Sequence, residues 1–220
     1  SRPGARPVSL KEELARVVPV IRSLCKKIKV PVSVDTCKAE VARQALDSGA
    51  SIVNDITALG GDSLMAQVVN KYKAAVVLMH MKGKPSNMQR MPQYKDLMSE
   101  VIAYLSVAVK SALHAGISLE KIIVDPGIGF GKSLEHNLEI IKNLGELKVL
   151  GRPILVGVSR KTFIGKITGE NIDNRLAGTI SSSCFCVING ASIVRVHDVR
   201  EARRAFDVLD GILKYGKTRR

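Results

Sequence analysis

Six apolar stretches of the sequence each end in a residue that could do chemistry. The residues at these ends are carboxylates, an amide, imidazoles, a hydroxyl, a lysine and a guanidinium, namely Asp35, Asn54, His80, Asp125, Ser159 with Lys161, and Arg195 with His197. Such groups can hold ring N–H donors, bind an anion or stabilise developing charge. A parallel strand buried on both faces reads as a nearly continuous apolar run, and ligands bind at the carboxyl ends of such strands. The pattern therefore predicts one active site, built where six strands finish.

The apolar stretches alternate with helix-like segments along the whole chain. We expect strands at 30–35, 51–55, 74–80, 122–125, 153–159 and 191–197, and helices at about 9–28, 38–48, 62–72, 94–115, 135–145, 173–189 and 199–214. Regular alternation with short connections is typical of a parallel sheet. No internal repeat, linker or low-complexity segment interrupts the alternation. We therefore expect a single domain over residues 1–220.

Two architectures fit this alternation, an open doubly wound sheet and a (β/α)8 TIM barrel. Six strands suit the open sheet by number, but usually only the strands beside its switch point contribute site residues. Here all six strands end in a candidate residue, which favours the barrel. A barrel of typical length, about 250 residues, needs two further strands. We therefore expect strands 3 to 8 of a barrel in this chain, with the first two upstream of Ser1.

Composition excludes several classes of protein. Hydrophobic residues make up 45% and charged residues 25% of the chain, as is ordinary for a globular protein. No apolar run reaches the roughly 18 residues of a membrane span, and the first residues carry no signal pattern, so we expect a cytoplasmic protein without a membrane partner. The net charge of +14 could indicate nucleic-acid binding. The basic residues are scattered and no such motif is present, so we expect a small anionic substrate and no nucleic acid.

The segment DPGIGFGK at 125–132 is the most distinctive local motif. Lys132 occupies the third glycine position of a dinucleotide-binding GxGxxG, and Pro126 occupies the first glycine position of a Walker A loop, so neither motif is complete. What remains is a glycine-rich turn from a strand to a helix, whose glycines allow close approach to a ligand. Asp125 could accept hydrogen bonds from a ligand's ring N–H and amino groups, or it could only cap the turn.

Two cationic residues near the end of the chain also have two interpretations. A charge such as Arg195 inside a strand is costly unless it is paired, so it predicts either a buried ion pair or a bound anion. Barrels often bind phosphate near their last two strands, which favours the anion. Lys161, directly after a strand, could stabilise developing negative charge. Alternatively, it could lie in solvent at a helix N-terminus, although the helix dipole disfavours a cation there.

Taken together, the segments resemble the motifs of the dihydropteroate synthase family. The similar segments, in the same order as in that family, are SRPG at 1–4, SVDT at 33–36, NDI at 54–56, LMHM at 78–81, DPGIGFGK at 125–132, SRK at 159–161 and RVHDV at 195–199. Each motif is weak alone, but the ordered set is specific and covers essentially the whole chain. The family is a (β/α)8 barrel, in agreement with the expectation from the strand ends.

The resemblance implies a transferase of folate biosynthesis. In its reaction, 6-hydroxymethyl-7,8-dihydropterin diphosphate and 4-aminobenzoate give 7,8-dihydropteroate and diphosphate. It also implies Mg²⁺ as cofactor, sulfonamides as competitors and a homodimer. The metal-linked asparagine of the family's first strand and the aspartate of its second strand have no match in residues 1–220. The resemblance therefore implies no metal ligand in this chain and one upstream of Ser1.

Matched position also implies a role for individual residues. The catalytic residues would be Lys161, Asp35 and Asp125. The resemblance places Asp35, Asn54, Ile56, Met79, Asp125, Gly157 and Lys161 around the pterin, Arg195 and His197 at the diphosphate, and Arg2, Pro3, Phe130, Ser159 and Lys161 around the 4-aminobenzoate. No Ser/His/Asp machinery is expected, because an arylamine is already a nucleophile.

Two functions of other classes remain open at this point. A pterin-binding methyltransferase that acts with a corrinoid protein shares the barrel and the pterin-holding aspartate and asparagine. The segments RPG, SRK and RVHD argue against it, because they serve aminobenzoate and diphosphate. A non-catalytic binding barrel is the other alternative, and lack of turnover would favour it.

Overall fold

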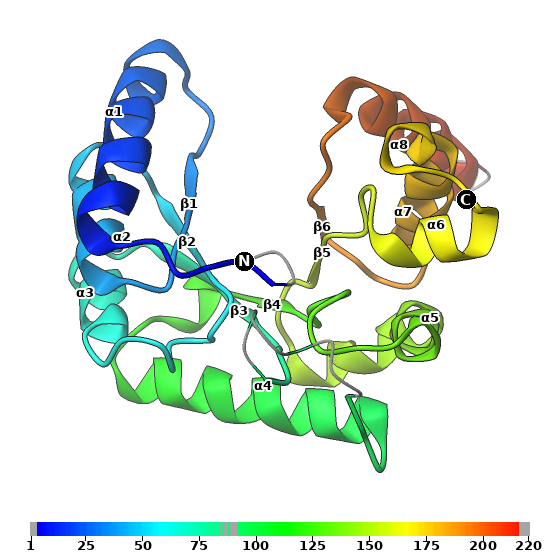
Figure 1. Cartoon of the computed structure of the whole chain (residues 1–220), viewed down its shortest axis with the longest axis horizontal. Helices are drawn as coiled ribbons and strands as arrows, with labels where there is room; N and C mark the ends of the chain where they lie inside the picture. The colour runs from blue at the N-terminus through cyan, green and yellow to red at the C-terminus, as the bar shows by residue number, and fades with distance from the viewer. Residues whose placement is uncertain (1–3, 84, 86–87, 89–91, 216–220) are drawn as a thin grey trace.

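Six parallel strands wind in chain order through the middle of the molecule (Figure 1). The computed structural model describes residues 4–83, 85, 88 and 92–215. Its strands are β1 (Ser33–Asp35), β2 (Ile52–Asp55), β3 (Ala75–Met79), β4 (Ile122–Asp125), β5 (Leu155–Val156) and β6 (Ile193–Val194). Strands β1 to β4 form one sheet and β5 pairs with β6. An isolated parallel bridge between Val124 and Ile154 joins the two parts.

The strand order distinguishes the two expected architectures. A doubly wound sheet reverses its order at the switch point, whereas a barrel adds each strand beside the previous one. Here the strands follow one another in sequence order, with β1 to β4 paired in one sheet, β5 paired with β6, and the bridge from Val124 to Ile154 joining β4 to the residue before β5, and every pairing is parallel. Among the described residues, no strand pairs with the outer edge of β1 or of β6. The (β/α)8 barrel prediction is therefore confirmed.

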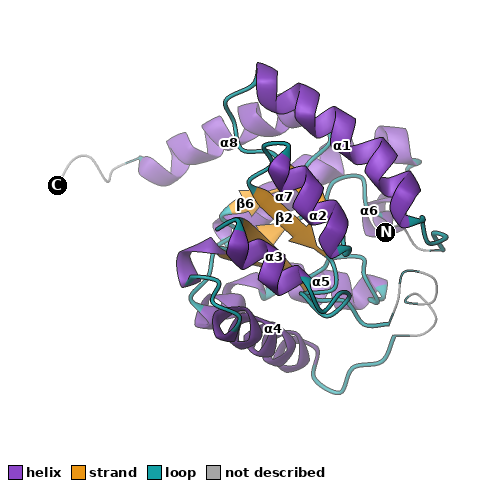
Figure 2. Ribbon diagram, turned by 90° about the vertical axis from the view of Figure 1, so that its left-hand side faces the viewer, coloured by secondary structure: helices purple, strands orange, loops and turns teal. Residues whose placement is uncertain are grey.

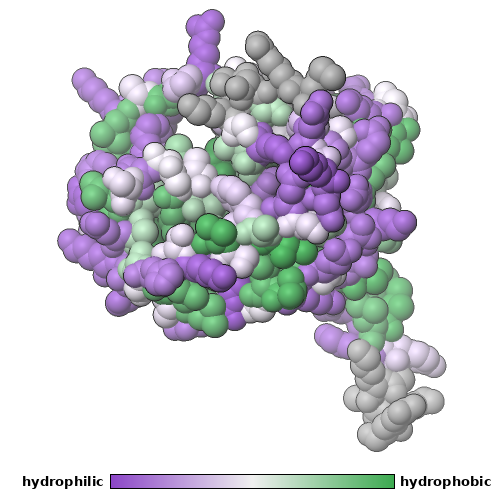
Figure 3. Space-filling view, turned by 90° about the horizontal axis from the view of Figure 1, so that it is seen from below, coloured by the Kyte–Doolittle hydropathy of each residue, from purple (hydrophilic) through white to green (hydrophobic). Residues whose placement is uncertain are grey.

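Helices surround the strands on the outside, as Figures 1 and 2 show. The α-helices are α1 (Leu10–Lys27), α2 (Ala39–Asp47), α3 (Met65–Lys71), α4 (Leu97–His114), α5 (Leu134–Lys142), α6 (Thr162–Thr168), α7 (Leu176–Ile188) and α8 (Val199–Lys214), and the 3-10 helices are η1 (Leu119–Lys121), η2 (Leu144–Leu150) and η3 (Ile172–Asn174). No helix within the described ranges is long and apolar enough to cross a membrane. On the face that carries α4, hydrophilic side chains surround small apolar areas (Figure 3).

Two strand predictions were too long, and one helix prediction joined two elements. The expected strand 153–159 is regular only over Leu155–Val156, because the backbone turns soon afterwards, where the Lys161 N–H donates to the Val158 carbonyl. The expected strand 191–197 is regular only at Ile193–Val194, although Arg195 still donates to the Val156 carbonyl over 2.8 Å. The expected helix 135–145 ends at Lys142, and a separate 3-10 helix follows it.

Side-chain caps explain where α4 and α5 begin after the connections that precede them. Asp96 accepts a hydrogen bond from the Ser99 N–H over 3.0 Å at the start of α4. Ser133 and His136 form a reciprocal capping box at the start of α5, directly after the glycine-rich segment. Such caps satisfy N–H groups that have no partner inside the helix, and each contributes about 1 kcal/mol. They also fix the point at which each loop ends, beside the carboxyl ends of the strands.

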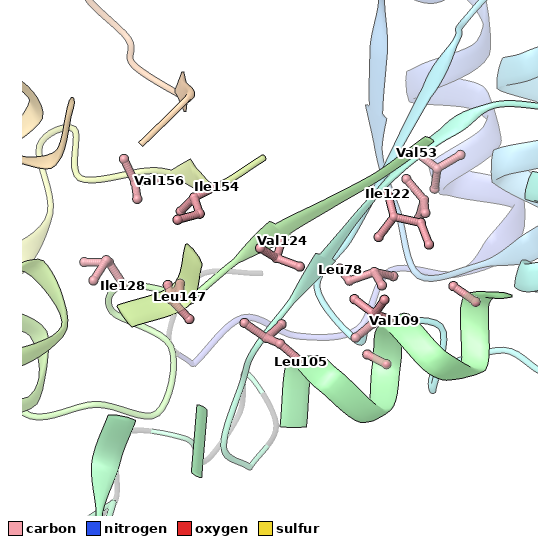
Figure 4. Packing of buried hydrophobic residues seen from close by; sticks show 14 of the residues in the cluster. Val53, Leu78, Leu105, Val109, Ile122, Val124, Ile128, Leu147, Ile154 and Val156 are labelled. Carbon is pink, nitrogen blue, oxygen red and sulfur yellow. The ribbon is translucent and has the colours of Figure 1, made fainter. Parts of the chain in front are cut away.

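The core lies between the strands and the helices that cover them (Figure 4). Leu78 of β3 and Leu105 of α4 are fully buried and belong to one apolar cluster that extends to Val156 of β5. Burying each leucine contributes about 1.5–3 kcal/mol. The cluster includes residues of β3 and α4, which flank the long β3–α4 connection, and of β4 and α5, which flank the β4–α5 loop. It therefore holds the strand ends, which carry the polar residues, at fixed positions.

The β4–α5 loop packs tightly against the segment that follows β3. Gly127 has a φ of +68° and Gly131 a φ of +63°, and a Cβ atom on either would clash with a backbone carbonyl, that of His80 and that of Lys82 respectively. Only glycine meets both requirements, a left-handed conformation and a close backbone approach. The glycine-rich motif therefore serves first to seat this loop against its neighbour.

We expect Gly127→Ala to destabilise the protein more than Gly151→Ala. Both glycines are left-handed, but a Cβ on Gly151 meets nothing within 4 Å. Gly151→Ala should cost about 1–2 kcal/mol of conformational strain, and Gly127→Ala about 1–3 kcal/mol more from overpacking. Urea denaturation of the two variants measures the difference. Equal losses would mean that the loop can move away from His80 without cost.

Candidate active site

Polar residues from the ends of three strands meet at the carboxyl end of the sheet, and a glycine after a fourth strand leaves room for them. Asn54 at the end of β2 and Asp125 at the end of β4 are 4% and 1% exposed. Arg195, directly after β6, donates to Asn54 Oδ1 over 3.0 Å and lies 3.4 Å from Asp125 Oδ2. A Cβ on Gly157, directly after β5, would lie 3.0 Å from the guanidinium. The barrel thus brings together side chains as far as 141 residues apart in sequence.

The predicted pterin residues around this centre differ in exposure. Asp35 lies beside Asn54 in the parallel register, but β1 is an edge strand here and Asp35 is exposed. Met79, beside Asp125 in the register, is fully buried, and Ile56 is 8% exposed. The structure therefore places two acceptors, an amide and two apolar side chains around one strand-end region.

Asp125 both caps its own turn and faces the site. Its Oδ1 accepts a hydrogen bond from the Gly127 N–H over 2.7 Å, while Oδ2 faces Arg195. The two interpretations of this residue are thus compatible. Asn54 has an unsatisfied group, because its buried Nδ2 has no hydrogen-bond partner within the described part of the chain. A buried amide N–H without a partner costs about 1–3 kcal/mol. Desolvation raises the pKa of the neighbouring Asp35, against opposing effects of Arg195 and of the Asn54 side chain.

Asp55, next to Asn54, has both side-chain oxygens hydrogen-bonded within its own turn, whereas Asn54 keeps a group that is unpaired among the described residues. Asp55 is fully buried, yet its Oδ1 accepts from the Thr57 N–H over 2.8 Å and from the Thr57 hydroxyl over 2.6 Å. Its Oδ2 accepts from the Leu59 N–H over 2.9 Å. Both carboxylate oxygens therefore stabilise the β2–α3 turn, and Asp55 is a structural residue.

A cavity of about 480 Å³ opens beside this centre. Most of its lining comes from the β4–α5 and β5–α6 connections and the helices that follow them, and the rest comes from the β3–α4 connection, from the segment between α6 and α7 and from the residues after β6. The lining residues are Met88, Gly129, Phe130, Lys132, Ser133, Leu134, Asn137, Ser159, Arg160, Lys161, Thr162, Phe163, Lys166, Ile172, Arg175 and His197. Three of the five residues predicted around 4-aminobenzoate are in this set. Arg2 and Pro3 lie outside the described residues.

Lys161 connects the cavity to the polar centre. Its Nζ donates to the Ile128 carbonyl and lies 4.6 Å from the centroid of the Phe130 ring. Desolvation lowers the pKa of Lys161 to about 8, with Asp125 acting in the opposite direction and Arg195 adding to the lowering. The ammonium is thus held over an aromatic ring and remains charged at neutral pH.

Ser159 and His197 form a second contact between neighbouring strand ends. Ser159 Oγ lies 2.9 Å from His197 Nδ1 and accepts from the His197 N–H over 3.2 Å. The imidazole is exposed and the hydroxyl is buried. Ser159 therefore contacts both the backbone and the ring of His197 and fixes the orientation of the imidazole.

The predicted residues leave out several that line the cavity. Arg160, Thr162 and Asn137 line it without any role from the matched motifs. Thr162 directly follows the SRK segment, so its position at the start of a helix could have identified it. Asn137 accepts from the Gly129 N–H over 2.6 Å, a contact that no local pattern reveals.

Arg160 holds a strained backbone conformation between two cavity residues. Its φ is +56°, which is unusual for any residue except glycine. Its N–H donates to Thr179 Oγ1 over 2.9 Å, and its carbonyl accepts from Arg175 Nη1 over 3.0 Å. Its guanidinium pairs with Asp198 at 2.5 and 3.0 Å. Such strain persists only where surrounding contacts fix it, and here it orients the residues on either side.

The described residues do not form a metal site by themselves. No group of three or more His, Cys, Asp or Glu side chains in the described ranges could hold an ion. At the cationic end of the site, Arg195 has no lone pair to donate, and His197 Nδ1 is engaged by Ser159. The residues present therefore do not fit Mg²⁺ as a complete ligand set.

We expect Thr179→Val to destabilise the protein by about 1–3 kcal/mol, because it leaves the Arg160 N–H without an acceptor. Thr179 is fully buried, so water cannot replace the hydroxyl. Thr179→Ser keeps the acceptor and is the matched control, with a loss of about 1 kcal/mol or less. Chemical denaturation compares them. Equal stability of the two variants would show that this hydrogen bond does not hold the Arg160 conformation.

Comparison with known proteins agrees with this geometry. Residues 1–197 match the family of pterin binding enzymes. The dihydropteroate synthase of Synechocystis sp. is 46% identical over 213 residues, which cover 96% of this chain and 74% of that protein. The Yersinia pestis dihydropteroate synthase, solved in complex with a sulfonamide drug, is 38% identical with a TM-score of 0.93, covering 97% of this chain and 77% of that one.

A further solved structure contains 7,8-dihydropteroate. The dihydropteroate synthase of Xanthomonas albilineans in complex with 7,8-dihydropteroate is 38% identical, with a TM-score of 0.89, and covers 96% of this chain and 77% of that one. These two solved relatives are both dihydropteroate synthases, as the fold and the strand-end residues indicate. The chain belongs to the dihydropteroate synthases of the pterin-binding enzyme family.

Proposed function

We propose that the strand-end centre binds 6-hydroxymethyl-7,8-dihydropterin diphosphate and that the adjoining cavity binds 4-aminobenzoate. The observation that carries this assignment is the meeting of Asn54, Asp125 and Arg195 beside a cavity lined by Lys161 and Phe130. One region offers acceptors and an amide to a flat polar ring. The other offers an aromatic ring and a cation to an anionic aryl group. Both open at the same end of the sheet.

The reaction requires little covalent chemistry from the protein. The bond between the pterin methylene carbon and the diphosphate oxygen breaks, and both electrons leave with diphosphate. The arylamine nitrogen forms a bond to that carbon and then loses one proton to solvent. The enzyme can therefore act mainly by positioning the two substrates and by stabilising the leaving charge.

Asn54 and Asp125 suit the polar edge of a pterin. The carboxylate of Asp125 can accept from the ring N–H and amino groups, and the unpartnered Nδ2 of Asn54 can donate to a ring acceptor. Asp35 would contribute a further carboxylate from the neighbouring strand. Met79 and Ile56 are buried nearby and would form apolar contacts with the ring faces.

Arg195 and His197 suit the diphosphate. The Arg195 side chain is 41% exposed although it pairs with a buried carboxylate, so it can contact an anion in solvent at the same time. The 16-residue helix α8 begins two residues after His197. Backbone N–H groups at a helix start favour phosphate oxygens. Gly157 leaves room for the guanidinium over the site.

Phe130, Ser159 and Lys161 suit the 4-aminobenzoate, together with Arg2 and Pro3, which lie outside the described residues. The Gly4 N–H donates to the Pro85 carbonyl over 2.9 Å. The same connection carries Met88, which lines the cavity. This contact places the residue after the SRP segment beside the β3–α4 connection and supports a role for that segment near the aryl group.

Three broader assignments belong to the same proposal. Exposed apolar residues of α7 and α8 (Phe185, Ile188, Val208 and Ile212) support a homodimer, which light scattering of the purified protein tests. A cytoplasmic location accords with the substrates and awaits fractionation. A Mg²⁺ requirement stays a prediction, which is tested by treating the active enzyme with a chelator and then restoring the ion.

A diphosphate-release assay with both substrates tests the function directly. We expect release only when the pterin diphosphate and 4-aminobenzoate are present together, and inhibition by a sulfonamide that competes with 4-aminobenzoate. Methyl transfer to a corrinoid protein in place of diphosphate release would refute the assignment.

We expect Asp125→Asn to weaken pterin binding by about 1.5–3 kcal/mol, because it removes a charge-assisted acceptor. The asparagine oxygen can still accept from the Gly127 N–H, so the turn should be retained. Binding of 4-aminobenzoate should change much less. Calorimetric titration with a pterin measures the loss, and unchanged affinity would remove Asp125 from the pterin site.

We expect Lys161→Ala to lower kcat/KM at least about tenfold, whereas a solvated lysine would cost within about 0.5 kcal/mol. Lys161→Arg should not restore activity, since the planar guanidinium cannot replace a compact point charge between a carbonyl and a ring.

The pKa of Lys161 also predicts a pH dependence. With a pKa of about 8, the ammonium is present below that pH and lost above it. Wild-type kcat/KM should therefore fall as the pH rises through about 8, and this step should be absent in Lys161→Ala. Steady-state kinetics would contradict the role if Lys161→Ala kept near-wild-type kcat/KM.

A further inference from the structure

A second lysine, Lys132 of the glycine-rich loop, is buried and has no role in the reaction described above. Lys132 is 2% exposed, and lysine is rarely buried to this extent unless it is paired. Its Nζ lies 2.9 Å from His80 Nδ1 and donates to the Phe130 carbonyl over 3.0 Å. The ammonium thus joins the end of β3 to the part of the β4–α5 loop that carries Phe130.

His80 is suited to receive this hydrogen bond. Its ring is buried and packs edge-on against Tyr104, with centroids 4.9 Å apart, and is tilted against Tyr94 at 6.2 Å. Desolvation, with smaller effects of Lys132 and Lys82, lowers the pKa of His80 to about 3, against an opposing effect of Glu100. A neutral imidazole can carry its proton on Nε2 and accept at Nδ1.

The same loop is attached to the β3 exit at several other points. Gly127 and Gly131 approach the carbonyls of His80 and Lys82 so closely that no side chain fits. The Tyr94 hydroxyl donates to the Gly131 carbonyl over 2.8 Å. Several contacts therefore join the segment after β3 to the β4–α5 loop, and the Lys132 ammonium makes one of them through His80.

The position of Phe130 depends on this attachment. Lys161 holds the first half of the loop through the Ile128 carbonyl and lies over the Phe130 ring. Lys132 holds the second half through the carbonyl of Phe130 itself. Two lysines thus fix the backbone on either side of the aromatic ring that lines the cavity. Desolvation lowers the pKa of Lys132 to about 7, with Asp125 opposing and Lys161 adding to the lowering, so burial of this side chain has a cost.

We propose that Lys132, through His80, is a positioning residue that fixes Phe130 and so determines the affinity of the cavity for the aryl substrate. The inference rests on the proposed function, because it takes the cavity as the 4-aminobenzoate subsite. Lys132 touches no substrate in this proposal. It acts only through the backbone of Phe130.

The test is steady-state kinetics of Lys132→Met in the active enzyme, with both substrates varied. Methionine keeps the length of the side chain but cannot donate. We expect KM for 4-aminobenzoate to rise about tenfold, as a displaced ring misorients the aryl group, with KM for the pterin diphosphate within about twofold of wild type. Lys110→Met, which removes an exposed lysine of α4, is the control and should match wild type in both constants.

Two variants of His80 test the same contact from the other side. His80→Asn places an amide oxygen near the position of Nδ1 and should keep KM for 4-aminobenzoate close to wild type. His80→Leu removes the acceptor and should raise it. Combined with Lys132→Met, His80→Leu should add little, because the two residues act through one contact. These variants decide the question if Lys132→Met does not unfold cooperatively.

The outcomes separate this inference from the proposed function. An enzyme that releases diphosphate normally, but whose KM for 4-aminobenzoate is unchanged in Lys132→Met and His80→Leu, would overturn the role of Lys132 alone. Equal increases in both KM values would also overturn it, since they would indicate a general loss of structure. Absence of turnover in wild type would instead refute the proposed function.

Discussion

The parallel pairing of six consecutive strands is the constraint on which the rest of the structure depends. Because every strand runs in the same direction, all six carboxyl ends reach one rim, and the register there places Asp35 beside Asn54 and Met79 beside Asp125. Arg195, from the last strand, then closes a contact across the rim with the second and fourth strands. The strand ends that carry these polar groups cannot move apart without breaking backbone pairing.

Close contacts fix the loops beyond the rim. Gly127 and Gly131 allow backbone contacts that any other residue would block. Arg160 adopts a left-handed conformation that three neighbouring side chains hold. The first loop uses glycines, which adopt this conformation without strain, whereas the second accepts strain at Arg160 between two residues that line the cavity. A site that works by positioning depends on such fixed backbone more than on reactive groups.

Several positive charges gather around Asp125 at the rim. Arg195 lies 3.4 Å from this buried carboxylate, and Asp125 acts on the pKa values of Lys161 and Lys132, both of which desolvation lowers. Burying these lysines is unfavourable for folding, whereas a group of cations favours the binding of an anion. A diphosphate and an anionic aryl partner would bring negative charge to this group. The whole chain is also basic, with a net charge of +14.

The sequence by itself determined the fold class, the family and the end of the sheet at which the site lies. Apolar runs that alternate with helical segments specify parallel strands. Polar residues at the ends of such strands can be buried only where they find partners, so the pattern alone could identify Asn54 and Asp125. Only the tertiary structure decided that Arg195 pairs with both, that Lys132 is buried against His80, and that Arg160 is left-handed. These features depend on contacts between residues far apart in the chain, which no local periodicity encodes.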